Sequence, residues 1–123
     1  MNVVVLGASD DPEKYSHKAV VLLKEKGHAV FPVNPSLKTL EGLQVYPSIS
    51  DVPQVVDTIS LYVSPNVSSK IGGDILNKSP RRIIFNPGAE NPELEARAKS
   101  QGITALNACT LVLLRTNQFD RKA

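Results

Sequence analysis

Five short stretches of small, polar and turn-forming residues recur along the 123-residue chain, and each one directly follows an aliphatic run. Small residues let backbone amides approach a ligand closely, and asparagine or serine adds side-chain hydrogen bonds. Strand-to-helix turns need the same residue types, so one stretch alone carries little weight. Together, the five predict a binding site for a polar small molecule. The stretches are Gly7-Ala8-Ser9, Asn34-Pro35-Ser36, Ser64-Pro65-Asn66, Asn86-Pro87-Gly88 and Asn107-Ala108-Cys109.

The first of these stretches carries the most information about a ligand. Gly7-Ala8-Ser9 follows an aliphatic run and precedes a helical pattern, which is the setting in which helix N-terminal amides bind phosphate. The spacing is not that of a G-x-G-x-x-G fingerprint, because the polar segment continues as far as Ser16. We therefore expect a longer loop that folds over the ligand as a flap, with Lys14 and Ser16 facing a phosphate.

The second stretch bears on the identity of the ligand. Domains that bind NAD usually carry an acidic side chain here, which holds the two hydroxyls of the ribose. This chain has Asn34 instead, followed by Pro35 and then by Lys38. A stretch without an acidic side chain, but with a lysine nearby, favours a ribose that carries a phosphate group. Coenzyme A and NADP both carry such a ribose. Lys38 is equally explained as a solvated loop residue, so this observation leaves the ligand open.

The stretches depend on the elements that would bring them together. The run 3–6 is continuous and aliphatic, which is typical of a strand buried on both faces of a parallel sheet. Asn91 and Pro92 are typical of a helix start, and Pro32 indicates a strand that bends or lies near an edge. Residues 34–53 are expected to be irregular. Strands are predicted over 3–6, 29–33, 58–63, 82–85 and 103–106, helices around 19–26, 67–76 and 92–101, and a last buried segment over 111–114.

Strands alternate with helices along the whole chain, and this alternation predicts the fold. It indicates an α/β, Rossmann-like three-layer domain with a five-stranded parallel sheet, and we expect one domain over residues 1–123. The predicted strand order is 3-2-1-4-5. In such a sheet all five polar stretches lie at the carboxyl edge, and a ligand crevice opens where the order reverses, above strands 1 and 4.

Composition excludes several classes of protein. The formal net charge is only +2, the basic residues are scattered and tryptophan is absent, so a nucleic-acid partner is not expected. We find no apolar run long enough to span a membrane and no signal peptide, and we expect a cytoplasmic protein. One cysteine and two histidines do not support a disulfide framework or a metal centre.

Several segments together resemble the CoA-binding domain family, whose fold is shared with the N-terminal domain of the succinyl-CoA synthetase alpha subunit. The resemblance implies coenzyme A as ligand, with its nucleotide held by the first two loops. Family members commonly carry Gln or Glu in the fourth loop, where this chain reads Phe85-Asn86-Pro87-Gly88-Ala89-Glu90-Asn91. The synthetases also add a phosphohistidine domain, for which we expect no room here. The resembling segments are 4–9, 12–16, 33–35, 40–42, 45–48 and the region of Cys109.

The resulting hypothesis is a stand-alone CoA-binding protein that acts as a regulator, carrier or sensor. The sequence shows no general base beside a nucleophile, which favours binding over catalysis. An NAD(P)-dependent or other small-nucleotide enzyme is the alternative, and a purely structural subunit is a third. Free CoA and acyl-CoA both fit as ligands, and no protein partner is indicated.

Cys109 is predicted near the CoA thiol, or else is a small buried residue before an apolar helix. The predicted ligand contacts are Gly7, Ala8, Ser9, Lys14, Tyr15, Ser16, Asn34, Pro35, Lys38, Ser64, Pro65, Asn86, Pro87, Gly88 and Cys109.

Overall fold

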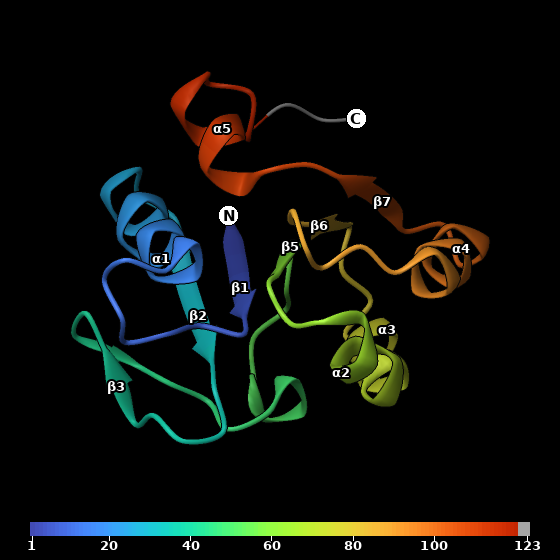
Figure 1. Ribbon diagram of the computed structural model, residues 1–123, viewed down its shortest axis with the longest axis horizontal. Coiled ribbons are helices and arrows are strands. Elements are labelled where there is room, and N and C mark those ends of the chain that lie inside the picture. Colours follow the sequence, from blue (N-terminus) through green and yellow to red (C-terminus); the bar gives the residue numbers. More distant parts are fainter. Residues whose placement is uncertain (121–123) are drawn as a thin grey trace.

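A five-stranded parallel sheet forms the centre of the computed structural model, in which residues 1–120 are described (Figure 1). This confirms the predicted α/β, Rossmann-like class. Leu6 at the end of β1 pairs with Val33 on one side and with Leu61 on the other, so the carboxyl ends of the strands share one edge. The strands are β1 (Asn2–Leu6), β2 (Ala29–Val33), β5 (Thr58–Leu61), β6 (Arg82–Phe85) and β7 (Thr104–Asn107).

The lateral order of the strands differs from the prediction. The observed order is β2-β1-β5-β6-β7, so the third strand along the chain lies beside β1 and not beside β2. The predicted order 3-2-1-4-5 is wrong at this point. All four residues of β5 are buried, as an interior strand requires, whereas β2 exposes Ala29 and includes Pro32, which lacks a ladder donor. The order therefore reverses between β1 and β5, and the crevice is expected there.

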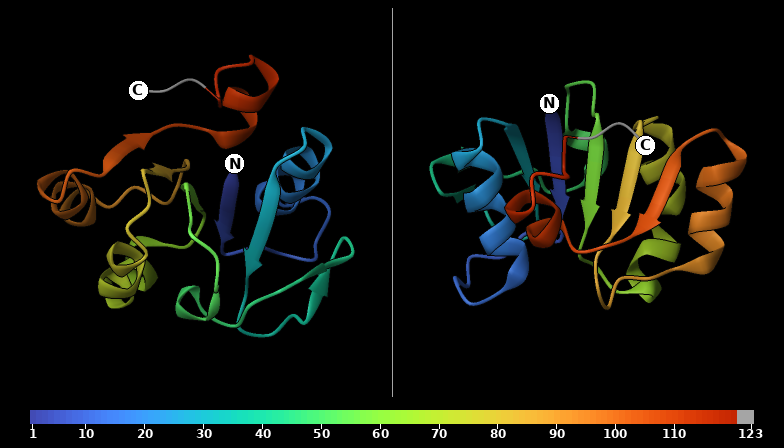
Figure 2. Two further views of the ribbon diagram at one scale, coloured as in Figure 1. Left: turned by 180° about the vertical axis from the view of Figure 1, so that it is seen from behind. Right: turned by 90° about the horizontal axis from the view of Figure 1, so that it is seen from above.

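Helices cover both faces of the sheet, as Figures 1 and 2 show. The helices α1 (Tyr15–Glu25) and α5 (Thr110–Arg115) pack on one face, and α2 (Pro65–Lys70), α3 (Gly72–Asn77) and α4 (Pro92–Ser100) pack on the other. Alternate residues of β1 enter opposite cores: Val3 and Val5 face α1, while Val4 and Leu6 face α3 and α4. The two-sided burial explains why β1 is continuously aliphatic.

Two helical segments differ from the prediction in detail. The segment 67–76 forms two short helices, because the chain leaves helical geometry at Ile71, immediately before Gly72. A Cβ at Gly72 would lie only 3.3 Å from a methyl group of Leu94, so this glycine permits close packing against α4. Helix α1 begins at Tyr15, which places Tyr15 and Ser16 in its first turn and shortens the predicted loop.

The segment between β2 and β5 holds structure that the sequence did not predict. A small antiparallel hairpin is formed by β3 (Thr39–Leu40) and β4 (Leu43–Gln44), followed by the 3₁₀ helix η1 (Ile49–Asp51). Buried Leu40 joins the core beside α1, so the hairpin packs against that helix. No helix within residues 1–120 combines the length and apolarity needed to cross a membrane.

His28 links the start of the chain to the segment after α5. Its Nδ1 lies 3.2 Å from the terminal ammonium of Met1, and its Nε2 lies 3.2 Å from Oδ1 of Asp120. An ammonium can only donate, so Nδ1 accepts and Nε2 carries the proton that faces Asp120. The imidazole, of which 8% is exposed, also meets the ring of Phe119 edge-on. These contacts suit the neutral ring.

Acidification is expected to destabilise the protein through His28. Burial, followed by the charges of the terminal ammonium and of Arg82, lowers the pKa of His28 below 6.5, against an opposing effect of Asp120. Below pH 6.5 the unfolded chain therefore binds more protons than the folded one, and the free energy of unfolding falls as the pH drops towards the folded pKa. NMR titration of the ring should give a midpoint below 6.5. Urea unfolding of His28→Gln should show a flatter pH profile in this window, and a midpoint at or above 6.5 would contradict the assignment.

Candidate functional site

The five polar stretches lie together at the carboxyl edge of the sheet, as predicted for parallel strands (Figure 2). Their side chains divide into two groups. Asn34 and Asn86 are taken up by hydrogen bonds within the fold, whereas Lys14, Tyr15, Pro35, Lys38 and Pro87 are exposed. Ser64 caps α2 by accepting a hydrogen bond from the amide of Val67, and Pro65 occupies the first turn of that helix.

The loop after β1 is tied to the end of β2 by its first two amides. The N–H groups of Gly7 and Ala8 both donate to the carbonyl of Val33, at 3.1 and 3.0 Å. Gly7 has φ +93°, and a Cβ at this residue would lie 2.9 Å from Cγ1 of Val63. Gly7 is thus required by the packing of the strand ends. Because these two amides already have an acceptor, the loop can offer a ligand only the donors that follow them.

Five later amides are placed to serve as those donors. The backbone N–H groups of Ser9, Asp10, Tyr15, Ser16 and His17 have no acceptor within residues 1–120. Three of them form the first turn of α1, which has no side-chain cap and no acidic residue. An uncapped helix N-terminus carries a partial positive charge and favours an anion. This end of α1 is therefore the best phosphate position at the edge.

Asn34 connects the first two loops. Its Nδ2 donates to the carbonyl of Ala8 at 2.7 Å, and its Oδ1 accepts from the amides of Ser36 and Leu37 at 2.7 and 3.2 Å. The side chain is thus occupied on both atoms. Its observed role is to hold the tips of β1 and β2 at a fixed distance from each other.

Asn86 organises the other half of the edge from a buried position. Its Nδ2 donates to Oγ of Ser60 at 3.0 Å and to the carbonyl of Leu61 at 2.9 Å, while its Oδ1 accepts from the amide of Thr110 at 2.8 Å. The Ser60 and Thr110 hydroxyls also share a hydrogen bond of 2.7 Å. This network joins β5, β6 and α5, and it leaves the exposed Pro87 and Gly88 as the outer part of the fourth loop.

Cys109 lies beside this network, immediately before α5 and partly exposed. The hydroxyl of Tyr62 is buried nearby and has no hydrogen-bond partner within residues 1–120. Burial raises the pKa of Tyr62 to about 12, although the nearby Ser60 and Thr110 hydroxyls partly oppose this effect. The phenol is therefore protonated at neutral pH. In the same described part of the chain, no three His, Cys, Asp or Glu side chains are grouped so that they could hold a metal ion.

An apolar cavity of about 190 Å³ opens at the tips of β1, β2 and β5, where the strand order reverses. Beside it lies a more open hollow of about 360 Å³, which shares Pro35 and Pro47 and contains Lys38. The sequence identified Gly7, Pro35 and Lys38 but missed the apolar walls, because their spacing is also that of ordinary core residues. The missed residues are Leu6, Val33, Pro47, Ser48, Ile49, Val63, Val67, Ile71 and Asp74, of which Ser48 and Asp74 are polar.

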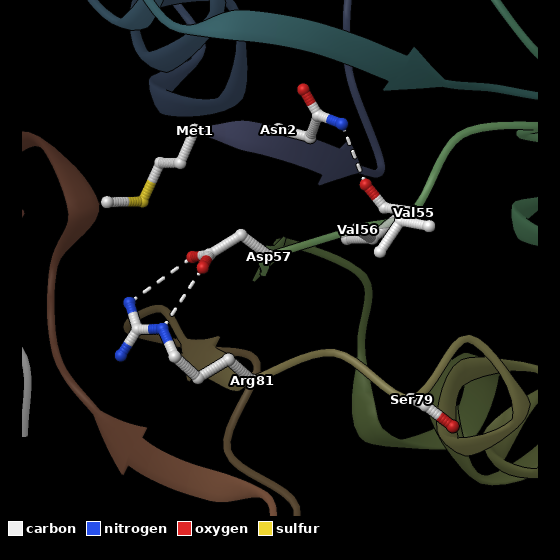
Figure 3. A pocket seen from close by; sticks show the side chains of 7 residues that line it. All are labelled: Met1, Asn2, Val55, Val56, Asp57, Ser79 and Arg81. Atoms are coloured by element: carbon white, nitrogen blue, oxygen red, sulfur yellow. Dashed lines mark hydrogen bonds and ion pairs between the residues drawn. The ribbon is translucent and has the colours of Figure 1, made fainter.

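A hollow of about 580 Å³, larger than the two at the carboxyl edge, lies at the opposite, amino end of the sheet (Figure 3). Its charged groups are paired: Nε and the NH2 nitrogen of Arg81 donate to the two carboxylate oxygens of Asp57 at 3.0 and 3.2 Å. Burial alone would raise the pKa of Asp57, but the hydrogen bonds from Arg81 and Thr58 outweigh it and lower the pKa. Asn2 is likewise occupied by the carbonyl of Val55. Because Arg81, Asp57 and Asn2 are already engaged within the fold, this open hollow is a weaker candidate than the carboxyl edge.

Comparison with known proteins points to one family. The family described as "CoA binding domain" matches residues 1–115. The chain is 21% identical to the uncharacterized protein YneT of Bacillus subtilis, over 85% of this chain and 77% of that protein. It is 28% identical to acetate–CoA ligase [ADP-forming] II of Archaeoglobus fulgidus, over 94% of this chain but only 19% of the ligase. A crystal structure of an uncharacterized protein superimposes with a TM-score of 0.87 at 33% identity, covering 96% of this chain and 97% of the other.

Replacing Gly7 by alanine is expected to destabilise the fold by about 1–3 kcal/mol, because alanine is strained at positive φ and its methyl group would collide with Val63. Gly88→Ala is the matched control, since Gly88 has φ +90° with nothing within 4 Å of the added carbon. Urea unfolding should show a larger loss for Gly7→Ala, part of which Val63→Ala restores. Equal losses for the two glycine variants would contradict the packing role.

Proposed function

The chain belongs to the CoA-binding domain family, and from this premise we propose that it binds coenzyme A at the carboxyl edge of its sheet. The observation that carries the proposal is the juxtaposition, at one edge, of an apolar cavity and an uncapped helix N-terminus. Coenzyme A combines an apolar adenine ring with a pyrophosphate, so it needs both kinds of surface. A single domain suffices for this binding.

The pyrophosphate is assigned to the first turn of α1. The amides of Ser9, Asp10 and the first turn supply donors that have no acceptor within residues 1–120, and the helix dipole favours the negative charge. Lys14 precedes the helix and is exposed, so its ammonium can reach a phosphate oxygen. Tyr15, which is 62% exposed, lies beside these donors and offers its ring to the outer side of the ligand.

The adenine is assigned to the apolar cavity between the β2 tip and α2. Val33, Val63 and Val67 contribute apolar walls, and Pro35 and Pro47 form the boundary with the neighbouring hollow. Lys38 lies in that hollow, where it can meet the phosphate on the ribose. At the β2 tip, where NAD-binding domains usually carry an acidic side chain, this chain has Asn34. The carboxylate that does line the cavity, Asp74, belongs to α3 and not to this tip.

The proposed role is binding in the service of regulation, transport or sensing, in the cytoplasm. The ADP-forming acetate–CoA ligase relative is about five times longer than the matched segment, since the match covers 19% of it. The proposal therefore does not extend the ligase's activity to this chain. An NADP-dependent activity is the second candidate, because Lys38 suits a phosphate at either position of the ribose.

Calorimetric titration with CoA, dephospho-CoA, NADP and NAD tests the ligand assignment. CoA is expected to bind most tightly, and dephospho-CoA and NAD more weakly because they have no ribose phosphate for Lys38. Lys38→Met should weaken CoA binding about three- to tenfold, as expected for a partly solvated charge pair, and leave dephospho-CoA unaffected. Lys26→Met, at the exposed far end of α1, is the matched control. Binding of NAD without binding of CoA would refute the assignment.

Cys109 is expected to lie within reach of the CoA thiol. A thiol reagent should label Cys109 in the native protein, because the side chain is partly exposed, and saturating CoA should slow the labelling. With CoA disulfide, attack by the Cys109 sulfur would form a mixed disulfide and release one CoA thiol, giving a mass increase that Cys109→Ser abolishes. A thiol that reacts only after denaturation would show that Cys109 is a core residue.

A further inference from the structure

His17 lies between the first loop and the hairpin, and each of its two ring nitrogens faces one of them. Its Nδ1 lies 2.8 Å from the carbonyl oxygen of Ser9, and its Nε2 lies 3.4 Å from Oε1 of Glu41 in the turn of the hairpin. Only 12% of the imidazole is exposed. A carbonyl oxygen can only accept a hydrogen bond, so Nδ1 carries a proton and donates it to Ser9. His17 therefore holds one carbonyl of the first loop against α1.

This contact determines where the next amide points. The described chain has no cis peptide bond, and in a planar trans peptide the C=O of one residue and the N–H of the next point in opposite directions. Because the Ser9 carbonyl is turned inward to a largely buried ring, the N–H of Asp10 is turned outward, on the exposed side of the loop. This N–H is one of the donors without an acceptor in residues 1–120.

The preceding peptide is held in the same way. Asn34 donates to the carbonyl of Ala8 at 2.7 Å, which directs the N–H of Ser9 away from Asn34. Two successive peptides thus have their carbonyls fixed by side chains from other elements, α1 and the β2 tip, while their amides stay available. Two neighbouring carbonyls anchored in this way leave the loop little freedom to turn its donors inward.

We propose that His17 is a positioning residue of the phosphate-binding loop, which fixes the Asp10 N–H as a donor to the anionic part of the ligand. The proposal rests on the proposed function, since it concerns the same site. His17 acts through the Ser9 carbonyl and does not itself contact the ligand. Oε1 of Glu41 faces Nε2 on the other side of the ring, and it pairs with the ring when Nε2 is protonated as well as Nδ1. The Glu41 carbonyl is bound by Nζ of Lys24 at 2.6 Å, which fixes the hairpin turn beside α1.

Two substitutions separate positioning from packing. In His17→Asn, the amide nitrogen stands the same number of bonds from Cβ as Nδ1, so the donor to Ser9 is kept although the ring is lost. In His17→Leu, the side chain keeps a branched shape at this point but has no donor. A merely structural histidine would be replaced at least as well by leucine as by asparagine, whereas a positioning histidine would be rescued by asparagine only.

The test combines titration with CoA and with inorganic pyrophosphate for the wild type, His17→Asn and His17→Leu. His17→Leu should bind both ligands roughly tenfold more weakly, because one oriented donor to an anion is lost. His17→Asn should stay within about threefold of the wild type. Glu25→Gln, at the exposed far end of α1, is the control and should bind normally. Without ligand, the chemical shift of the Asp10 amide should differ from the wild-type value in His17→Leu and lie close to the wild-type value in His17→Asn. If His17→Leu does not fold, His17→Ala takes its place.

The outcomes distinguish this inference from the proposed function. If the wild type binds CoA and His17→Leu binds it equally well, the positioning role is wrong and the proposed function stands. Equal losses in His17→Asn and His17→Leu also overturn it, because they assign the effect to packing. If the wild type does not bind CoA, the proposed function fails. Pyrophosphate binding and the Asp10 resonance then decide the positioning role, and identical behaviour of wild type and His17→Leu overturns it.

Discussion

The carbonyl of Val33 accepts hydrogen bonds from the amides of both Gly7 and Ala8, and the architecture of the carboxyl edge depends on this contact. The turn that makes it possible needs positive φ at Gly7, where a side chain would also meet Val63. Asn34 completes the connection by donating to the carbonyl of Ala8. These hydrogen bonds fix the path of the chain after β1. They thereby also fix where the later amides of the loop and the N-terminus of α1 lie along the edge.

The same constraint relates the two surfaces that a nucleotide would need. The first loop leads to the open N-terminus of α1 on one face, and Gly7 itself lines the apolar cavity with Val33 and Val63. The strand order reverses at this point, between β1 and β5. Doubly wound sheets bind ligands where neighbouring crossovers leave on opposite faces, because there a crevice opens between the loops. Packing of the strand ends thus forms the crevice independently of any ligand.

The sequence predicted the elements well where one physical signal dominates. Short, mostly apolar runs identified all five strands, of which only β1, over residues 3–6, is continuously aliphatic, and Asn91 with Pro92 identified the start of α4. The predicted lateral order of the strands was wrong because the residue pattern of a strand does not specify which strands pair with it. The proline in β2 was the one feature that indicated an edge position for that strand. The cavity walls were missed because Val67 and Ile71 have the spacing of core residues. Asn34 and Asn86 show why strand-tip residues are ambiguous: the same amide can serve a ligand or the fold, and the hydrogen-bond partners that the fold supplies decide between them.

Binding of coenzyme A at the carboxyl edge of the sheet can be mapped by following backbone amide shifts during a CoA titration. The largest shifts are expected at Ser9, Asp10 and the first turn of α1, together with residues such as Val63 and Val67 around the apolar cavity. Amides near Asp57 and Arg81, at the amino end, should stay unchanged. Shifts centred on that amino-end hollow, or no shifts at saturating CoA, would show that CoA does not bind at the carboxyl edge.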